Sequence, residues 1–343
     1  MSRKTEPIIE RDLVIVGGGP AGMAAAISAH ANGVEDILLL ERDQYLGGIL
    51  QQCVHTGFGL TYFQELLTGP EFADRFIKKI RNIPGIEVSL RSFVTHLTAE
   101  RVLTVLKPGE VQQVRARALI MATGCRERTR EMAHIAGSRP SGIFSAGLAQ
   151  KLINTEGLLP GSRVVVVGSG DIGLIMARRF ILEGAQVQAV VEIQKVSKGL
   201  RRNVVQCLED FDIPLYFSHK ISFIHGRDRV EKVDVVQVDD ELNERSGSKF
   251  QIECDTVLIS AGLIPENELI EMAGVAIDKQ TNSPVSGELN TTSIPGIFVC
   301  GNSFQVYDLA DSVARDSEKA GSQAAEYLRR ARAGGARDGG RAP

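Results

Sequence analysis

Cysteine side chains are the first candidates for chemistry in this sequence, and Cys53 has the most suggestive neighbours. It lies in GGILQQCVHTGFG (residues 47–59), between two glycine-rich turns, and His55 follows two positions later. A nearby cation or a helix N-terminus lowers the pKa of a thiol and increases its reactivity. Histidine can also move a proton near neutral pH. Cys53 and His55 are therefore the candidates for catalytic roles.

The positions of the five cysteines argue against paired-thiol and metal chemistry. They never form a CxxC or CxxxxC pair, and they lie at Cys53, Cys125, Cys207, Cys254 and Cys300. Disulfide exchange needs two thiols close together, and zinc or iron–sulfur sites need clustered ligands. We expect no metal site in this chain. For Cys53, a packed thiol and a single-cysteine mechanism through a sulfenic acid or mixed disulfide both remain open.

Two glycine-rich turns are the second candidate for chemistry, because one pattern occurs twice. DLVIVGGGPAG begins at Asp12 and SRVVVVGSGDIG begins at Ser162. The corresponding markers are all 151 residues apart, and they are Gly17 and Gly168, Gly19 and Gly170, Gly22 and Gly173, and Glu41 and Glu192. Each copy predicts a strand, a G-x-G-x-x-G turn, a helix and a second strand that ends in an acidic residue.

This pattern is typical of dinucleotide binding. The first glycine allows a tight turn, the second lets the backbone approach a pyrophosphate, and the third lets helix pack on strand. Free N–H groups at the helix start would face the phosphates. Glu41 and Glu192 would accept hydrogen bonds from ribose hydroxyls. The alternative is a pair of tight turns that bind no ligand.

The acidic residue of the second copy bears on the choice of nicotinamide cofactor. A carboxylate at Glu192 binds a ribose 2′-hydroxyl and repels a 2′-phosphate, which favours NAD(H) over NADP(H). Basic residues that could accept a phosphate come only later, at Lys195, Lys198, Arg201 and Arg202.

The elements around these turns must position them. The 343 residues suffice for two or more domains, and the net charge of −3 provides no basic field for nucleic acid. The apolar run at 13–29 contains three consecutive glycines and a proline, so we interpret it as strand–turn–helix and expect no membrane span. Without a targeting segment, the cytoplasm is the default location.

The segments that follow each copy are also alike. We expect a helix at 71–82, a small antiparallel meander of three strands over 86–107, and a strand at 116–124 that ends in Ala-Thr-Gly. IPLYFSHKISFIHG, VEKVDVVQVDD and CDTVLISAGLIPE repeat the meander and strand. Residues 288–302 predict turn, strand and glycine, residues 311–331 predict an amphipathic helix, and residues 332–343 predict a disordered tail.

Together these motifs resemble the two-dinucleotide flavoproteins of the pyridine nucleotide–disulfide oxidoreductase type, which include thioredoxin reductase. The resemblance implies an α/β fold of two Rossmann-like, three-layer ββα domains, with the NAD(P) domain inserted in the FAD domain. It implies an FAD domain at 1–124 and 263–331 and an NAD(P) domain at 125–262. No dithiol accompanies it, since the segment RPSGIFSAGLAQ, where thioredoxin reductases carry CxxC, has no cysteine.

The resemblance also implies the cofactor-binding residues. For FAD these are Gly17, Gly19, Pro20, Ala21, Gly22, Glu41, Arg42, Gly47, Gly48, Gln52, Val94, Ala122, Thr123, Gly124, Gly301, Asn302 and Val313. For NAD they are Gly168, Ser169, Gly170, Asp171, Ile172, Gly173, Glu192 and Gly262. Asn302 is a departure, because the family usually has aspartate there. An amide brings no negative charge beside the pyrophosphate, but it still forms hydrogen bonds.

GGILQQCVHTGFG, LTGPEF, GIFSAGLAQKLIN and CGNSFQVYDLADSVARDSEKAG resemble a narrower group. This group contains the FAD/NAD subunits of hydrogen cyanide synthase, opine oxidase and dye-linked proline dehydrogenase, and proteins that accompany glycerol-3-phosphate dehydrogenases. It implies an electron-transfer subunit that passes hydride between nicotinamide and FAD, with a protein partner carrying iron–sulfur or flavin. The resemblance leaves open whether the chain forms a homo-oligomer or a hetero-oligomer. The alternatives are a stand-alone NAD(P)H oxidase or diaphorase, and a flavin-binding scaffold with a vestigial NAD domain.

Overall fold

The chain forms two compact units in the computed structural model, which describes residues 8–286 and 290–338. Unit 1 combines residues 1–126 with 264–343, and unit 2 is residues 127–263, inserted between them. The chain therefore passes between the units at 126–127 and at 263–264, where the sequence placed boundaries at 124–125 and 262–263.

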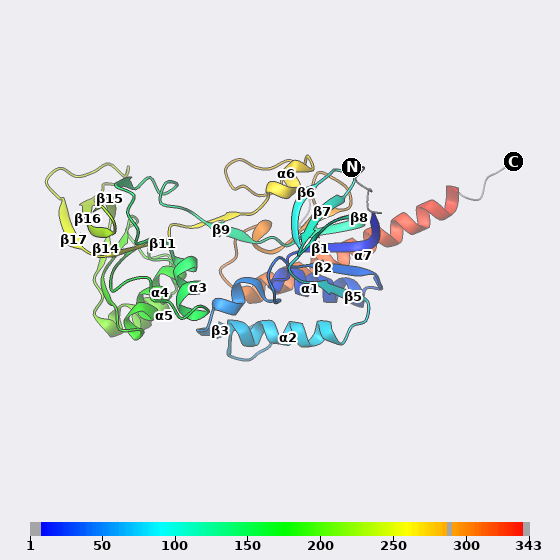
Figure 1. The fold of residues 1–343 in the computed structure, drawn as a ribbon, viewed down its shortest axis with the longest axis horizontal. Coiled ribbons are helices and arrows are strands. Elements are labelled where there is room, and N and C mark those ends of the chain that lie inside the picture. The colour runs from blue at the N-terminus through cyan, green and yellow to red at the C-terminus, as the bar shows by residue number, and fades with distance from the viewer. Residues whose placement is uncertain (1–7, 287–289, 339–343) are drawn as a thin grey trace. The chain divides into compact units, whose positions relative to one another are not determined.

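Unit 1 is built on a sheet whose central strands are parallel (Figure 1). The order is β5 (Ile86–Ser89), β2 (Ile37–Leu40), β1 (Ile9–Val16), β8 (Glu110–Met121), β7 (Val102–Lys107) and β6 (Phe93–Leu97). The pairs β8–β7 and β7–β6 are antiparallel, and β20 (Ile297–Val299) also pairs with β8. Strands buried on both faces need continuous apolar runs. Residues 13–16 of β1 and all of β2 are such runs, and they are buried throughout.

The two faces of this sheet carry separate hydrophobic cores. On one face lie α1 (Pro20–Ala31), α2 (Gly69–Arg81) and α7 (Ala310–Asp338). The second core includes side chains of β6, β7 and α6 (Glu268–Met272). A Cβ added at Gly321 of α7 would lie 2.3 Å from the Ala25 carbonyl oxygen, so this glycine allows the close approach of α1 and α7. Helices, parallel sheet and the second β layer give the expected ββα order.

Unit 2 repeats this architecture. Its five-stranded parallel sheet has the order β11 (Ile143–Ser145), β18 (Thr256–Ile259), β12 (Arg163–Val167), β13 (Gln186–Glu192), β14 (Leu215–Phe217). One core packs it against α3 (Ala146–Asn154), α4 (Asp171–Leu182) and α5 (Arg201–Cys207). A second core joins it to the sheet of β10 (Ala136–Gly137), β15 (His219–Gly226), β16 (Val230–Gln237) and β17 (Phe250–Glu253).

Short elements complete the described chain. β3 (Thr56–Phe58) pairs with β4 (Leu67–Thr68), and β9 (Cys125–Glu127) pairs with β19 (Leu263–Pro265). Three 3₁₀ turns are η1 (Gly48–Gln52), η2 (Glu209–Phe211) and η3 (Gly301–Ser303). The predicted helix at 71–82 is α2, which starts earlier because Thr68 and Glu71 form a capping box at its N-terminus.

Two expectations about the elements were wrong. The segment IEVSL does not open an antiparallel meander, because β5 pairs parallel with β2. The helix α2 that precedes β5 returns the chain to the parallel direction, as in a βαβ unit. The predicted disordered tail is helical as far as Asp338. Alanine and arginine favour helix, and a packed helix extends without a new nucleus. Residues 339–343, and residues 288–289 of the predicted turn, lie outside the described residues.

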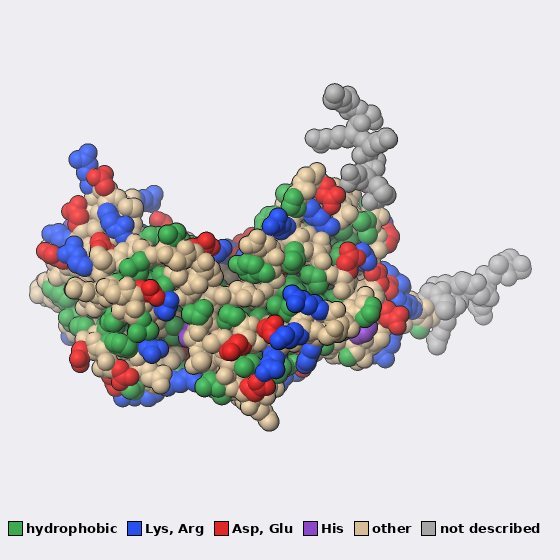
Figure 2. Space-filling view, turned by 60° about the horizontal axis from the view of Figure 1, so that its bottom comes forward, with side chains coloured by type: hydrophobic (Ala, Val, Ile, Leu, Met, Phe, Trp, Pro, Cys, Tyr) green, Lys and Arg blue, Asp and Glu red, His purple; other side chains and the backbone are tan. Residues whose placement is uncertain are grey.

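None of the helices within residues 8–286 and 290–338 is both long and apolar enough to cross a bilayer. On the face drawn in Figure 2, basic and acidic side chains are interspersed over the described part of the chain.

Candidate functional site

The first glycine-rich loop joins β1 to α1 and leaves an open surface at its second glycine. Gly17 has φ +108°, and a Cβ on Gly22 would lie 1.8 Å from the Gly17 carbonyl oxygen. A Cβ on Gly19 would have no atom within 4 Å. No side chain caps the N-terminus of α1, and Pro20 fills its first turn. The helix therefore presents uncapped N–H groups next to open space.

Glu41, directly after β2, is bound to this loop. Its side chain is 5% exposed. One carboxylate oxygen accepts from the Gly18 N–H at 2.7 Å and the other accepts from the Asp43 N–H at 2.8 Å. A carboxylate can accept more than two hydrogen bonds, so Glu41 is held in place and still has capacity for a ribose hydroxyl.

The segment that contains the Gly-Gly pair lies directly on the first glycine-rich loop. The Gly47 N–H donates to the Gly18 carbonyl oxygen at 2.9 Å. A Cβ on Gly48 would lie 3.1 Å from Gly19 Cα. Gln52 follows in the same turn and is buried. The structure thus brings together the predicted FAD residues of 17–22, 41 and 47–52.

The strand end Ala-Thr-Gly closes the same region. A Cβ on Gly17 would lie 2.3 Å from the Ala122 carbonyl oxygen. The Thr123 hydroxyl donates to the Glu266 carbonyl oxygen at 2.7 Å. A Cβ on Gly124 would have no atom within 4 Å, so its surface is open as that of Gly19 is.

Gly301 and Asn302 lie at the start of η3, beside α1 and α7. A Cβ on Gly301 would lie 2.6 Å from the Ala21 Cβ and 3.4 Å from a Val313 methyl. The Asn302 amide uses both of its ends, since its nitrogen donates to Cys125 Sγ at 3.4 Å and its oxygen accepts from the Tyr307 N–H at 3.1 Å. An aspartate could not donate to Cys125, which is a local reason for the amide here.

The side chains of two predicted FAD residues, Val94 and Arg42, do not join this group. Val94 is buried in the core on the opposite face of the sheet, so only its backbone could reach a cofactor. The Arg42 side chain is exposed.

The second glycine-rich loop joins β12 to α4 and has the same construction. Gly168 has φ +92°, and a Cβ on Gly173 would lie 2.6 Å from the Gly168 carbonyl oxygen. A Cβ on Gly170 would have no atom within 4 Å. No side chain caps α4. Ile172 and Gly262 are half-buried and exposed, respectively.

Glu192 binds the second loop as Glu41 binds the first, with one additional bond. It is 5% exposed. One oxygen accepts from the Ser169 N–H at 2.8 Å and from the Ser169 hydroxyl at 2.7 Å, and the other accepts from the Gln194 N–H at 2.8 Å. The Asp171 carboxylate is turned to the following loop, where it accepts from the Leu200 N–H at 2.8 Å and from Asn203 at 2.7 Å.

The residues present fit the ADP part of a dinucleotide at both loops. Each loop combines a tight turn, an open second glycine, an uncapped helix N-terminus and a buried glutamate. Those features match the requirements of a pyrophosphate and a ribose. In unit 1, Gly47, Gly48, Gly124 and Gly301 add glycine backbone that a longer cofactor could approach.

Cys53 is a half-buried thiol that donates to the Ile49 carbonyl oxygen at 3.3 Å. Burial raises the pKa of Cys53 to about 12. A Cβ on Gly69 of α2 would lie 2.7 Å from the Cys53 Cβ, so the cysteine packs against α2. The His55 ring lies 5.1 Å from that of Phe58, and its Nδ1 is 3.2 Å from the Thr56 carbonyl oxygen. These surroundings favour a packed, protonated thiol.

The other cysteines and the acidic residues provide no metal cluster in the described ranges. Burial raises the pKa of Cys207 to about 11 and the pKa values of Cys254 and Cys300 to about 12. Within residues 8–286 and 290–338, no group of three or more His, Cys, Asp or Glu side chains is arranged to hold a metal ion.

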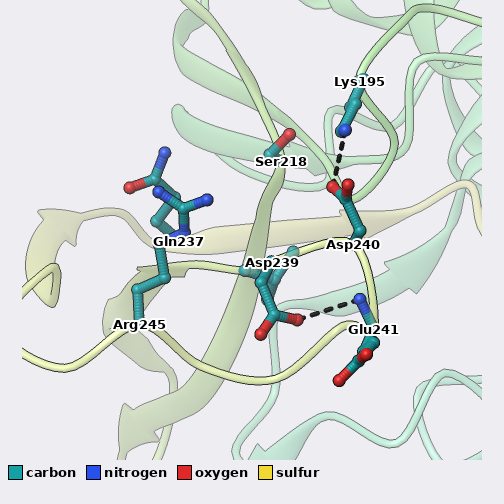
Figure 3. Close-up of a pocket in the computed structure, with 8 residues that line it drawn as sticks. Lys195, Ser218, Gln237, Asp239, Asp240, Glu241 and Arg245 are labelled. Carbon is teal, nitrogen blue, oxygen red and sulfur yellow. Dashed lines mark hydrogen bonds and ion pairs between the residues drawn. The ribbon is translucent and has the colours of Figure 1, made fainter.

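Unit 2 also has an open polar pocket of about 410 Å³ just beyond the end of β13 (Figure 3). It is lined by Lys195, Ser218, Gln237, Val238, Asp239, Asp240, Glu241 and Arg245. Lys195 forms an ion pair with Asp240 at 2.6 Å, and the Asp239 carboxylate accepts from the Glu241 N–H at 3.0 Å. The cation nearest to Glu192 in sequence is therefore already paired with a carboxylate.

Sequence reasoning missed two residues of these sites. Gly199 donates its N–H to the Ser169 carbonyl oxygen at 3.0 Å, just as Gly47 donates to Gly18, and the shared 151-residue offset with one insertion could have revealed it. Asp311 is 3% exposed and holds the loop after β3. Nothing in its spacing distinguished it from the other acids of a solvated helix.

Comparison with known proteins agrees with this geometry. The family described as "Pyridine nucleotide-disulphide oxidoreductase" matches residues 11–317. The chain is 27% identical over 282 residues to the HcnB component of hydrogen cyanide synthase from Pseudomonas protegens, covering 76% of this chain and 58% of that protein. It is 24% identical to an opine oxidase subunit from Agrobacterium tumefaciens, covering 85% and 61%. It is 26% identical to the CoA-dependent NAD(P)H sulfur oxidoreductase of Pyrococcus abyssi, covering 86% and 63%. The chain thus spans about three fifths of the length of these relatives.

Solved structures show the same fold. Thioredoxin reductase of Lactococcus lactis superposes with a TM-score of 0.73 at 21% identity, covering 93% of this chain and 99% of that one. L-proline dehydrogenase from P. horikoshii gives a TM-score of 0.63 at 19% identity, covering 93% and 56%. With the family match over residues 11–317, the chain belongs to the pyridine nucleotide-disulphide oxidoreductase family, a family of FAD-dependent oxidoreductases.

Proposed function

We propose that this chain is the FAD- and NAD-binding electron-transfer subunit of a dehydrogenase. Unit 1 would hold FAD and unit 2 would hold NAD(H). The observation that carries the proposal is the repeated site, in which each unit has its own open glycine loop and buried glutamate. When bound, FAD would supply the redox chemistry by exchanging a hydride with the nicotinamide.

The role of the protein's own residues in this function is to bind and orient. Glu41 and Glu192 would each fix a ribose, and the N-termini of α1 and α4 would each face a pyrophosphate. Gly47 and Gly48 would let the backbone lie against the cofactor in unit 1. No side chain is chemically required as a nucleophile for hydride transfer, and the high pKa of Cys53 fits a role in packing.

We infer a preference for NAD(H) over NADP(H). A carboxylate at Glu192 would accept a hydrogen bond from a ribose 2′-hydroxyl and would repel a 2′-phosphate. Two of the cations that follow are drawn to other carboxylates, since Lys195 pairs with Asp240 and Arg201 pairs with Glu209, each at 2.6 Å.

The inferred partner is a second protein that carries an iron–sulfur centre or another flavin, in the cytoplasm. Two of the relatives are named as subunits, of hydrogen cyanide synthase and of opine oxidase. A partner oxidising glycerol 3-phosphate or an amino acid-type substrate would exchange electrons with the flavin. The competing function is a stand-alone NAD(P)H oxidoreductase, because another relative is named as an NAD(P)H sulfur oxidoreductase without the word subunit.

The test is anaerobic reduction of the purified chain after reconstitution with FAD. NADH should bleach the flavin absorbance faster than NADPH does. A chain that keeps FAD but is bleached by neither nucleotide would contradict the electron-transfer role and favour a flavin scaffold. Fast turnover of NADH with oxygen alone, with no co-purifying protein, would favour the stand-alone oxidase.

A further inference from the structure

One side of the first turns of α7 carries three charged residues at helical spacing, Asp311, Arg315 and Glu318. Residues at i, i+4 and i+7 lie along one face of a helix. The neighbouring face carries Val313 and Ser317, whose atoms lie 3.4 and 3.9 Å from a Cβ built on Gly301. The start of α7 therefore touches the predicted FAD site on one face and presents these three charges on the next. We refer to them as the α7 clamp.

The α7 clamp holds the loop that follows β3. The Asp311 carboxylate accepts from the N–H groups of Gly59 at 2.9 Å, Thr61 at 2.8 Å and Tyr62 at 2.8 Å. The Thr61 hydroxyl donates to it as well, at 3.2 Å. Asp311 is 3% exposed, so all of these bonds form away from bulk water. Hydrogen bonds to a buried charge are among the stronger ones in proteins.

The other two members of the clamp hold the same loop. Arg315 donates to the Thr61 carbonyl oxygen at 2.8 Å. The Tyr62 hydroxyl donates to the Glu318 carboxylate. Burial alone would raise the pKa of Asp311, but the N–H groups of residues 59, 61 and 62 keep it below its usual range. Asp311 is thus a carboxylate near neutral pH.

Aromatic packing fixes the opposite side of this loop. The rings of Tyr62 and Phe63 lie 4.7 Å apart, and both pack on Phe72 and Phe76 of α2 at 5.2 to 6.2 Å between ring centres. The loop is therefore held between an apolar cluster on α2 and the charges on α7. Gly59 comes only eleven residues after Gly48, which lies against the first glycine-rich loop.

We propose that Asp311 is a positioning residue that, with Arg315 and Glu318, keeps residues 47–62 closed over the flavin. This inference rests on the proposed binding of FAD by unit 1. The chain leaves the glycine-rich loop at Gly48, passes Cys53 and His55, and is anchored again at residues 59–62. Without the α7 bonds, the segment keeps its packing on α2 and the pairing of β3 with β4, but it loses the hydrogen bonds that close residues 59–62, and it admits solvent and small oxidants to the flavin more readily.

The test compares Asp311→Asn with Glu326→Gln in the full chain loaded with FAD. Both changes turn one α7 carboxylate into an amide, but Glu326 pairs only with Arg330 at the surface in the described structure. Asparagine keeps one acceptor oxygen but turns its NH₂ group toward a backbone N–H donor, so at least one bond of the anchor is replaced by a donor–donor clash. We expect amide hydrogen exchange at residues 59, 61 and 62 to rise about tenfold in Asp311→Asn. Glu326→Gln should match the wild type.

The second readout is the access of oxygen to the flavin, compared between samples with equal FAD content. A residue that only stabilises the fold would not change this access. The flavin is reduced with dithionite, so the result does not depend on NADH binding. Reoxidation by dissolved oxygen should be about threefold faster or more in Asp311→Asn. If Asp311→Asn does not fold, Arg315→Gln and Tyr62→Phe each remove one bond of the same anchor and should change both readouts in the same direction by less.

The outcomes separate this inference from the proposed function. A wild-type chain that binds no FAD overturns the proposed function and the positioning role with it. A wild-type chain that binds FAD and is bleached by NADH, with unchanged exchange or unchanged reoxidation in Asp311→Asn, overturns the positioning role alone.

Discussion

The two glycine-rich loops use the same backbone frame and support it differently. In unit 1, Gly18 donates its N–H to Glu41 and accepts from the Gly47 N–H. In unit 2, Ser169 donates to Glu192 and accepts from the Gly199 N–H. The duplicated frame therefore includes a later glycine that closes each loop from outside. The two units share this backbone geometry although many of their side chains differ.

The support around this frame is where the units differ. In unit 2 polar side chains close to the loop provide it, because Ser169, Ser197 and Asp171 all bond within the segment 169–203. In unit 1 the loop is supported by glycine and proline, and the adjacent segment is anchored from a distance by Asp311 of α7. Unit 2 is thus locally self-supporting, whereas unit 1 depends on contacts about 250 residues apart in sequence.

The two loops should differ most in the stability that is lost when their third glycine is replaced by alanine. A Cβ on Gly22 would lie 1.8 Å from a backbone oxygen, but a Cβ on Gly173 would lie 2.6 Å from one. We expect Gly22→Ala to lower the free energy of unfolding by about 3 kcal/mol or more and Gly173→Ala by about 1 to 2 kcal/mol. Urea unfolding of both variants, with FAD content, checks this order. Equal losses would show that helix and strand separate as easily in unit 1 as in unit 2.

The matched glutamates should separate the cofactors of the two units. In Glu41→Gln and Glu192→Gln, an amide NH₂ takes the place of one carboxylate oxygen that accepts from a backbone N–H. The loss of that hydrogen bond costs about 1 to 3 kcal/mol. Glu41→Gln should weaken FAD binding, and Glu192→Gln should weaken NADH binding and reduce the preference for NADH over NADPH about tenfold. Titration with each nucleotide measures both. Loss of FAD in Glu192→Gln would reverse the assignment of the units.

The buried Asp234 of unit 2 should make the stability of the chain depend on acid pH. Burial alone would raise the pKa of Asp234, but Lys249, His225 and Gln251 hold it at about 2. Because this folded pKa lies below the ordinary aspartate value of 3.8, its stabilisation is present above that pH and is lost as the pH falls through about 2.

Asp234→Asn should therefore destabilise the chain by about 2 kcal/mol near neutral pH and by progressively less toward pH 2. Unfolding of wild type and variant over a pH series gives the difference. Added salt should also reduce the stability difference between wild type and Asp234→Asn, since Lys249 is exposed and its charge is screened. The stability lost in Asp311→Asn should not depend on salt, because the partners of Asp311 are backbone N–H groups. A difference that stays constant with pH would show that Asp234 acts through packing rather than charge.

Ser169→Gly makes the second loop resemble the first. It removes the hydroxyl that donates to Glu192 at 2.7 Å and keeps the backbone frame. We expect NADH binding to weaken by about 1 kcal/mol, without loss of folding. Ser197→Ala is the matched control, because its hydroxyl bonds to the Ser169 carbonyl oxygen and not to Glu192. If both variants weaken NADH binding equally, the loop shape and not the Glu192 contact sets the affinity.

The smallest effect is expected at Cys53. In unit 2, the segment 139–150, where thioredoxin reductases carry CxxC, has no cysteine. In unit 1, Cys53 is a packed thiol, and burial raises its pKa to about 12. Cys53→Ser should keep NADH-dependent flavin reduction within about twofold. Alkylation of the wild-type thiol near neutral pH should be slow for the same reason. Loss of reduction with FAD still bound would make Cys53 a redox group.

Sequence reasoning recovered the repeated parts of this protein better than the parts that occur once. The turns at residues 17 and 168 and the paired glutamates follow from local rules, because each needs a particular residue at a particular place. Strand β5 was assigned to the wrong kind of pairing, since five residues such as IEVSL carry no information on whether their partner is parallel or antiparallel. The tail was expected to be disordered, but it continues α7 to Asp338.

By itself, the sequence determined the duplicated ββα plan, the place of both glycine loops and the family to which the chain belongs. Those features depend on steric limits and hydrophobic periodicity within short segments. Only the tertiary structure decided that Gly199 closes the second loop, that Asn302 uses both ends of its amide, and that Asp311 anchors residues 59–62. The bonds of Asn302 to Cys125 and of Asp311 to residues 59–62 join segments far apart in the chain, and such bonds leave no pattern in a single sequence. For Gly199, the offset between the two copies indicates a glycine at that place but not the hydrogen bond that it makes.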